Sequence, residues 1–343
     1  MTDLFVGGED LSFTMTGGFG FGTLGTGDSY RTAFARGVVG AAAISISTAD
    51  PPAARATTPV FAATSSIWIH GQYSTQSTAG TTLNATLLRA LDGTGVARIV
   101  VRGTATSGQL KIDKRNSAGT FTNLVTSAAG ALPAKATPTS IDLWINYAVS
   151  GQCQLWIDGV NVADTGAGVD VTTDSATTLA QADFSQTTSA NTGHNTGWSE
   201  VLIRDSTTLG AAVFTIPPVA AGNTQSWTPN TVANINEVLT SDATLVATSS
   251  NNSLSEWTVS TTLPTGTWTI SSVQQEARVS RGATGPQHFE WLVRTVDGTD
   301  HVTGSVAPIT SFQNFANNWA TNPQTSAAWA VGDLINAGIE SLA

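Results

Sequence analysis

The chain has 343 residues, a formal net charge of −10 and only 11% charged residues, whereas soluble domains usually contain roughly 25%. Its length favours two domains, and 41% apolar residues with 10 Trp are enough for sizeable packed cores rather than disorder. The negative charge argues against a nucleic-acid partner, because phosphate binding needs clustered Lys and Arg.

Several features bear on the compartment in which the chain is made. Residues 1–6 contain neither a basic region nor an apolar stretch, so we expect no signal peptide. No apolar run approaches the ~18 residues of a membrane span, so we expect no membrane insertion. Cys153 is the single cysteine, which excludes an intrachain disulfide, and we expect it to pack as a small apolar side chain. Synthesis in the cytoplasm is therefore the expectation.

Strand patterns dominate after residue 60. Residues 65–73 alternate between apolar and polar side chains, as a half-buried strand does. The dipeptide Asp92-Gly93 lies between two strand-like runs and predicts a hairpin, and Asp158-Gly159 predicts another. Within 140–147, Trp144 falls on one face while the isoleucines and the leucine fall on the other. Short strands every ~8–12 residues, with turn signals between them, indicate an all-β sandwich or jelly roll.

We expect a boundary between two domains near residue 220. The run 217–223 reads Pro-Pro-Val-Ala-Ala-Gly-Asn and suggests a linker, because two prolines cannot donate hydrogen bonds to a central ladder. A second series of strand-like runs follows. Residues 327–337 have helical character, and Gly338 stands where a helix C-cap would lie. The prediction is a first domain at 1–220 and a smaller β-sandwich domain at 221–343 with one short C-terminal helix.

Two phrases of the sequence resemble a known protein family. The first is Trp198-Ser-Glu-Val-Leu-Ile-Arg-Asp205, which follows the hairpin sequence Leu155-Trp-Ile-Asp-Gly-Val160. The second runs from Trp319-Ala-Thr-Asn-Pro-Gln-Thr through Trp329 and Asp333-Leu to Gly338. Together they resemble tailed-phage virion proteins in which a laminin-G/concanavalin A-like lectin domain precedes a small β domain. The resemblance implies a concanavalin/laminin-G-like jelly-roll sandwich over roughly residues 1–220.

The resemblance also implies a function. It points to a non-enzymatic structural subunit of a bacteriophage or phage-like virion, such as a fibre, spike or tail-tip protein for host attachment. Its expected partners are other virion proteins, further copies of the chain in a homo-oligomer (a trimer is favoured) and a host-surface glycan. Two alternatives remain open: a capsid decoration protein, and a free carbohydrate-binding module or degenerate glycanase. Release of sugar from host polysaccharide would distinguish an enzyme from an adhesin.

Motifs for catalysis are absent from the sequence. Glycoside hydrolases on this type of sandwich need two carboxylates facing one groove, but Glu200 and Asp205 stand five residues apart and would point to opposite faces of an extended strand. The four histidines, His70, His194, His288 and His301, have no metal-ligand spacing. We therefore expect no enzyme and no catalytic residues.

Calcium is the one cofactor that the resemblance implies, since laminin-G-like domains often carry it and Ca²⁺ needs several oxygen ligands. The candidate ligands are Asp164, Asp170, Asp174 and Asp183; the alternative interpretation of each is a solvated loop carboxylate.

The aromatic residues are interpreted mainly as core. Tyr73, at an expected strand end, is the candidate ligand-binding aromatic on the rim. Trp144, Trp156 and Trp198 are expected in the core more than on a binding platform. Trp319 and Trp329 flank a Thr-Asn-Pro turn and are expected to form a structural clasp for the C-terminal helix.

Overall fold

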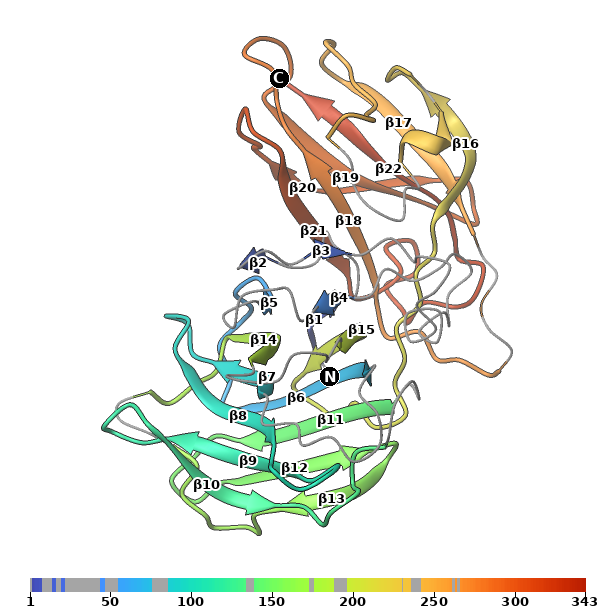
Figure 1. Ribbon diagram of the computed structural model, residues 1–343. Helices are drawn as coiled ribbons and strands as arrows, with labels where there is room; N and C mark the ends of the chain where they lie inside the picture. The colour runs from blue at the N-terminus through green and yellow to red at the C-terminus, as the bar shows by residue number, and fades with distance from the viewer. Residues whose placement is uncertain are drawn as a thin grey trace. The chain divides into compact units, whose positions relative to one another are not determined.

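The structure is a computed structural model. It describes the following residues: 2–7, 14–16, 20–21, 44–46, 55–75, 86–133, 139–172, 176–187, 196–229, 231–235, 242–260, 263 and 266–343. These residues fall into two compact units, the first reaching Val213 and the second running from Phe214 to Ala343. Both units are built from antiparallel β-sheets (Figure 1). Within the described ranges, no helix is long and apolar enough to cross a membrane.

The first unit contains two large sheets. The eight-stranded sheet has the order β13 (Val160–Asp164), β12 (Gln152–Ile157), β11 (Thr139–Asn146), β6 (Ser66–Thr75), β15 (Thr196–Arg204), β4 (Ile44–Ile46) and β3 (Gly20–Phe21), with β1 (Asp3–Gly7) also paired to β15. The seven-stranded sheet has the order β10 (Phe121–Thr126), β9 (Leu110–Arg115), β8 (Ala97–Gly103), β7 (Thr86–Leu91), β14 (Gln181–Thr187), β5 (Arg55–Thr57) and β2 (Thr14–Thr16). Neighbouring strands are often distant in sequence, as in the expected jelly-roll sandwich.

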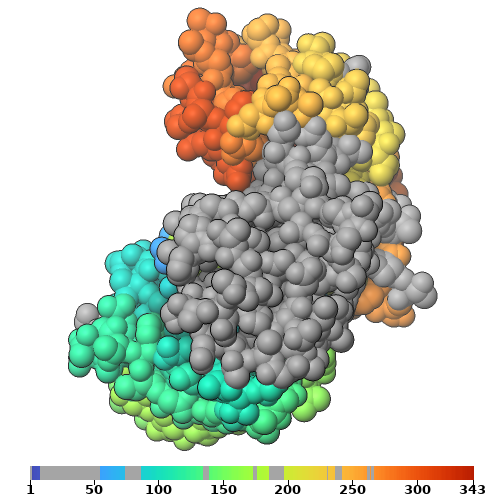
Figure 2. All heavy atoms as spheres, in the orientation of Figure 1, coloured from blue at the N-terminus to red at the C-terminus, as the bar shows by residue number. Residues whose placement is uncertain are grey.

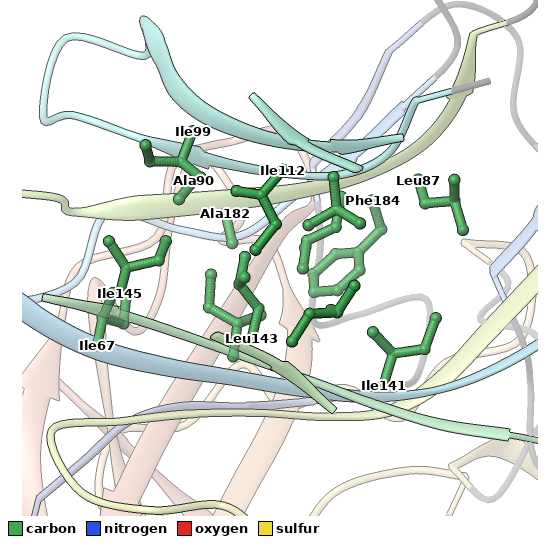
Figure 3. Packing of buried hydrophobic residues seen from close by; sticks show 14 of the residues in the cluster. Ile67, Leu87, Ala90, Ile99, Ile112, Ile141, Leu143, Ile145, Ala182 and Phe184 are labelled. Atoms are coloured by element: carbon green, nitrogen blue, oxygen red, sulfur yellow. The ribbon is translucent and has the colours of Figure 1, made fainter. Parts of the chain in front are cut away.

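One hydrophobic core lies between these sheets. Alternate residues of each strand point inward, so that Ile67 and Leu143 of one sheet face Ile99 and Ile112 of the other (Figure 3). Trp198 is fully buried at the centre of this core. Its ring makes edge-to-face contacts with Tyr73 of the same sheet and with Phe184 of the opposite sheet, at centroid distances of 5.1 and 5.0 Å. Described atoms coloured cyan and green, from the part of the chain that contains β8 to β12, lie at the surface of the space-filling view (Figure 2).

The turns predicted from the sequence are present. Asp92 begins the turn between β7 and β8, where its carboxylate accepts hydrogen bonds from the amides of Thr94 and Val96. Asp158 and Gly159 join β12 to β13 with φ angles of 48° and 76°, the left-handed conformation that Asp-Gly tolerates in a tight hairpin. Local sequence therefore fixes the hairpins, and these in turn set the register of the strands.

The second unit contains a five-stranded and a two-stranded sheet. The first has the order β16 (Pro218–Gln225), β17 (Ser253–Val259), β22 (Leu334–Leu342), β19 (His288–Thr295) and β20 (Asp300–Val306). The second pairs β18 (Val273–Val279) with β21 (Gln313–Trp319). A single 3-10 turn, η2 (Val232–Asn234), is the one helical element in the described ranges. Residues 218–223, expected as a linker, instead belong to edge strand β16, where a proline is tolerated.

The predicted C-terminal helix is wrong. Residues 334–342 form β22, which pairs with β17 on one side and β19 on the other. Gly338 is no C-cap; a Cβ atom there would come within 2.8 Å of the Cα atom of Glu256 in β17. Backbone pairing on both sides outweighs the weak helical propensity of this alanine-containing segment.

The C-terminal tryptophans contact each other, but the helix that they are expected to clasp is absent from residues 327–337. The indole N–H of Trp329 donates to the carbonyl oxygen of Trp319 at 2.9 Å, and both side chains are buried. The turn between them is tied by Asn322, whose side-chain amide donates to Asp333 at 2.9 Å. The Trp-Ala-Thr-Asn-Pro phrase is thus the joint between β21 and β22.

Candidate functional site

The calcium candidates are not gathered into one group in the described ranges. Asp164 ends β13 of the eight-stranded sheet, whereas Asp183 lies on β14 of the seven-stranded sheet. Asp183 is fully buried and accepts a hydrogen bond from the Nε atom of Arg89 at 2.6 Å. Asp170 caps the turn at Thr172 and pairs with Lys114. Asp174 lies outside the described residues, among which no cluster of three or more His, Cys, Asp or Glu forms a metal-binding group.

Tyr73 is not a rim aromatic. Only 2% of it is exposed, and its ring packs on Trp198 in the core. The prediction failed because residue 73 is not at the end of an isolated strand. Thr139 of β11 and Trp198 of β15 are its partners on the two sides, so the ring is covered from both.

A different aromatic cluster covers the outer face of the eight-stranded sheet. Trp68, Trp144 and Trp156 lie on β6, β11 and β12, in the strand positions that alternate with the core residues, and all three are half-buried. We call this surface the tryptophan face. The interpretation of Trp144 and Trp156 as core is therefore wrong, whereas that of Trp198 is confirmed.

The strand register places the three indoles side by side. Trp68 is directly opposite Trp144, and its ring stacks on that of Trp144 with a centroid distance of 6.0 Å. Trp68 also reaches diagonally across β11 to stack on Trp156 at 4.9 Å. The interplanar angles are 25° and 28°, so the stacked rings are roughly parallel to one another. The sheet thus presents a continuous aromatic strip across three strands.

Polar side chains border the strip at the β13 edge. The amides of Gln152 and Gln154 both donate to the Asp164 carboxylate, each at 2.7 Å. Burial raises the pKa of Asp164, but these two hydrogen bonds and a third from the Gly166 amide outweigh it, so the pKa lies below its usual range. Asp164 is therefore a charged acceptor at neutral pH. Because Asp164 is exposed, its carboxylate can also accept hydrogen bonds from hydroxyl groups.

A buried polar trio adjoins the strip. Asp142 stands opposite both Trp156 of β12 and His70 of β6. The Oδ1 atom of Asp142 accepts a hydrogen bond from the Oγ1 hydroxyl of Thr208 at 2.6 Å. The same oxygen lies 2.8 Å from the Nδ1 atom of His70. All three side chains are at most 2% exposed. Because the Asp142 carboxylate can only accept, it favours the His70 tautomer with the proton on Nδ1.

The trio does not have the connectivity of a nucleophilic triad. In such a triad the hydroxyl bonds the imidazole, but here the Thr208 hydroxyl bonds the carboxylate. Thr208 instead attaches the segment after β15 to the sheet. Of the two carboxylates considered for glycanase chemistry, Glu200 is 5% exposed with a φ of 52°, while Asp205 is exposed and accepts from the Thr2 amide.

Sequence reasoning missed Trp68, weighed His70 only as a metal ligand, and missed Thr208. The signal for the first two was available in the alternation Ser66-Trp68-His70-Gln72 along one strand. What the sequence did not contain was the register that brings Trp68 against Trp144 and Trp156. Thr208 had no local signal, because its partner Asp142 is 66 residues away.

No protein-family model and no curated protein matches the chain. Among solved structures, the binding domain of botulinum neurotoxin DC in complex with SialylT is 6% identical, with a TM-score of 0.40 over 96% of this chain and 89% of that chain. The endo-β-1,4-glucuronan lyase of the fungus Trichoderma reesei is 13% identical, with a TM-score of 0.40 over 60% of this chain and 97% of that one.

A further similar structure is the receptor-binding domain of botulinum neurotoxin mosaic serotype C/D. It is 6% identical, with a TM-score of 0.39, and the match covers 59% of this chain but only 47% of that chain. The chain thus spans about half the length of the first toxin domains it matches. At such identities and TM-scores, these likenesses support no transfer of function. The class defined by the fold itself is a β-sandwich protein with a second, smaller β unit.

Proposed function

We propose that the chain is a non-enzymatic adhesion protein whose tryptophan face binds a glycan. The observation that carries the proposal is the strip of Trp68, Trp144 and Trp156, half-buried on the outside of a rigid sheet. Indole rings offer flat apolar surfaces, onto which the C–H faces of sugar rings pack. A strip of this kind suits an extended saccharide better than a compact small molecule.

The border of the strip favours a neutral sugar. Gln152, Gln154 and Asp164 supply amide and carboxylate groups that can bond sugar hydroxyls. Asp164 keeps its negative charge at neutral pH because its pKa is lowered, so it would repel an acidic sugar placed beside it. A neutral, hydroxyl-rich glycan therefore fits the strip and its border together.

The test is a titration of the full chain with neutral oligosaccharides, using isothermal calorimetry. Trp144→Ala and Trp156→Ala each remove one indole. Each variant is expected to raise the Kd about tenfold, which corresponds to a loss of about 1.4 kcal/mol of binding free energy. Val160→Ala is the matched control, since Val160 is 64% exposed on the same hairpin and outside the strip. The proposal fails if the folded wild type binds no neutral glycan, or if both tryptophan variants bind as tightly as the control.

In the same proposal, the chain is a structural subunit of a tailed-phage or phage-like particle. Its support is the sequence resemblance in Trp198–Asp205 and in the run from Trp319 to Gly338. A homo-oligomer would multiply weak glycan contacts into useful avidity. Immunogold labelling of particles tests the location: gold on fibres or the tail tip supports the adhesin, and gold over the capsid indicates a decoration protein. Absence of labelled particles would indicate a free binding module.

A further inference from the structure

Basic side chains gather on the outer face of the seven-stranded sheet. Along its strands, the positions that alternate with the core residues are occupied by Arg and Lys much more often than by Asp or Glu. The basic residues are Arg55, Arg89, Arg98, Arg102, Lys111 and Arg115. These six belong to a set of 14 Lys and Arg in a chain whose formal net charge is −10. We call this surface the basic face.

The carboxylates on the same face lie below the cations. Asp183 and Asp113 are both 0% exposed, whereas the side chains of Arg102 and Lys111 are 31% and 30% exposed. Arg102 pairs directly with Asp113, and the Nζ atom of Lys111 lies 3.7 Å from the same carboxylate. The charge that reaches solvent is therefore positive, and the buried Asp side chains hold the cations in place.

The same arrangement repeats at the other end of the face. The guanidinium of Arg89 pairs with Asp183 at 2.6 Å, and that of Arg98 with Asp92 at 2.5 Å. Burial raises the pKa of Asp183, while the nearby charges of Arg89 and Arg55 lower it in part. One Asp183 oxygen, Oδ2, is buried without a hydrogen-bond partner in the described part of the chain. At this end, too, the guanidinium groups lie above buried carboxylates.

We infer that the basic face binds a carboxylate-bearing polysaccharide, a ligand distinct from the neutral glycan proposed for the tryptophan face. Guanidinium groups bond carboxylates in bidentate geometry, and Arg89, Arg102 and Lys111 provide cations along the sheet. Nucleic acid fits less well, because a chain with a formal net charge of −10 repels a continuous phosphate backbone beyond this one face.

The contrast between the two outer faces supports the inference. The strands of the eight-stranded sheet carry one Arg, Arg204, which is paired with Asp3, and no Lys. Asp142 and Asp164 add negative charge on that side. A polyanion approaching this sandwich would therefore be attracted to the seven-stranded sheet and repelled from the opposite one.

The experiment compares polygalacturonate with its fully methyl-esterified form, which has the same backbone without the charges. Binding of the full chain is measured by biolayer interferometry at 50 and 300 mM NaCl. The chain is expected to bind polygalacturonate but not the methyl-esterified polymer. The affinity for polygalacturonate should fall at least tenfold at the higher salt concentration, because salt screens exposed charges. Equal binding of the two polymers, equal binding of duplex DNA, or no binding of polygalacturonate would overturn the inference.

The variants are chosen so that the fold survives. Lys111→Gln with Arg115→Gln removes two cations, while Asp113 keeps its hydrogen bonds from Arg102 and Asn123. This double variant is expected to raise the Kd for polygalacturonate at least tenfold at 50 mM NaCl. Lys114→Gln is the matched control, because Lys114 is on the same strand but bonds the loop carbonyl of Asp170 rather than lying on the basic face.

Two results of the variant series separate this inference from the proposed function. Trp156→Ala should leave polygalacturonate binding within twofold of wild type, since Trp156 is on the other sheet. Likewise, the double variant Lys111→Gln/Arg115→Gln should leave neutral-glycan binding unchanged. If the double variant, folded as judged by circular dichroism, bound polygalacturonate like wild type, the basic face would not be the binding surface.

Discussion

Gly71 is the position at which a single methyl group should disturb the core most directly. It lies in the middle of β6, and a Cβ atom there would be 2.9 Å from Cε3 and 3.1 Å from Cζ3 of Trp198. Carbon atoms in contact normally lie about 3.5–4.0 Å apart. The Trp198 ring has no room to retreat, because Tyr73 and Phe184 pack against it edge-to-face and it is fully buried.

Overpacking of this kind costs about 1–3 kcal/mol. A shift of 1 kcal/mol corresponds to about 2–4 °C in Tm for a domain of 150–250 residues, so Gly71→Ala should lower the Tm of the first unit by about 2–12 °C. Gly93→Ala is the matched control, because its nearest neighbour, the Cβ atom of Ala180, is 3.8 Å away in ordinary contact. It should change stability by less than about 0.5 kcal/mol.

The assay is differential scanning calorimetry of both glycine variants beside wild type, in one buffer and at one protein concentration. Urea titration followed by tryptophan fluorescence provides a second measure of the free energy of unfolding. A Gly71→Ala variant as stable as Gly93→Ala would refute the reasoning, because it would mean that Trp198 can move away from β6 at little cost.

Three further predictions concern single residues. Burial raises the pKa of the Cys153 thiol to about 12, so at pH 8 only about one thiol in 10,000 is ionised. Iodoacetamide should therefore label the native chain negligibly and the urea-unfolded chain fully. Rapid labelling of the native chain would contradict the burial of Cys153. Burial alone would raise the pKa of Asp92, but hydrogen bonds from Thr94, Arg98 and Val96 outweigh this effect and lower the pKa to about 2. The ionised carboxylate therefore stabilises the folded state fully above pH ~4, and this stabilisation is lost as the pH falls towards 2. Asp92→Asn should therefore cost about 1–2 kcal/mol at pH 7, with the difference from wild type shrinking between pH 4 and 2 in thermal melts; a constant difference would exclude the ionised carboxylate as the cause. Gly338→Ala should push against the β17 backbone near Glu256 and destabilise the second unit by more than about 1 kcal/mol. Faster proteolysis of that unit would detect the loss of stability, whereas unchanged protease resistance would show that the β17–β22 pair accommodates the methyl group.

Local chemistry explains what the sequence predicted correctly. Asp92-Gly93 and Asp158-Gly159 determine their own backbone conformations, so both hairpins were predictable. The alternation in 140–147 also placed Trp144 and Leu143 on opposite faces correctly, although it did not show that the Trp144 face is the outer one. Each of these features depends on residues within a few positions of one another.

What the sequence could not predict depends on pairing between distant strands. Residues 334–342 have little strand signal of their own, and they become a strand because β17 and β19 hold them from both sides. Tyr73 looked like a strand end until its partners Thr139 and Trp198 were known. Both errors arose where tertiary pairing overrides local propensity.

The candidate surfaces show the same dependence. Trp68 and Trp156 are 88 positions apart in the numbering, and only the order β12-β11-β6 makes them neighbours. The basic face was hidden in the same way, because Arg55, Arg89 and Lys111 are dispersed in an acidic chain. Neither surface exists as a motif in the sequence.

The two-layer arrangement of the first unit also determines its valency. The outer faces of two sheets packed through one core point away from each other, so one flat surface cannot engage both. A single copy would therefore act as a bridge between two polymer strands, one neutral and one acidic. Mixed with both polymers, the wild-type chain would cross-link them into a network, whereas a variant lacking either face would coat one polymer and leave the solution fluid.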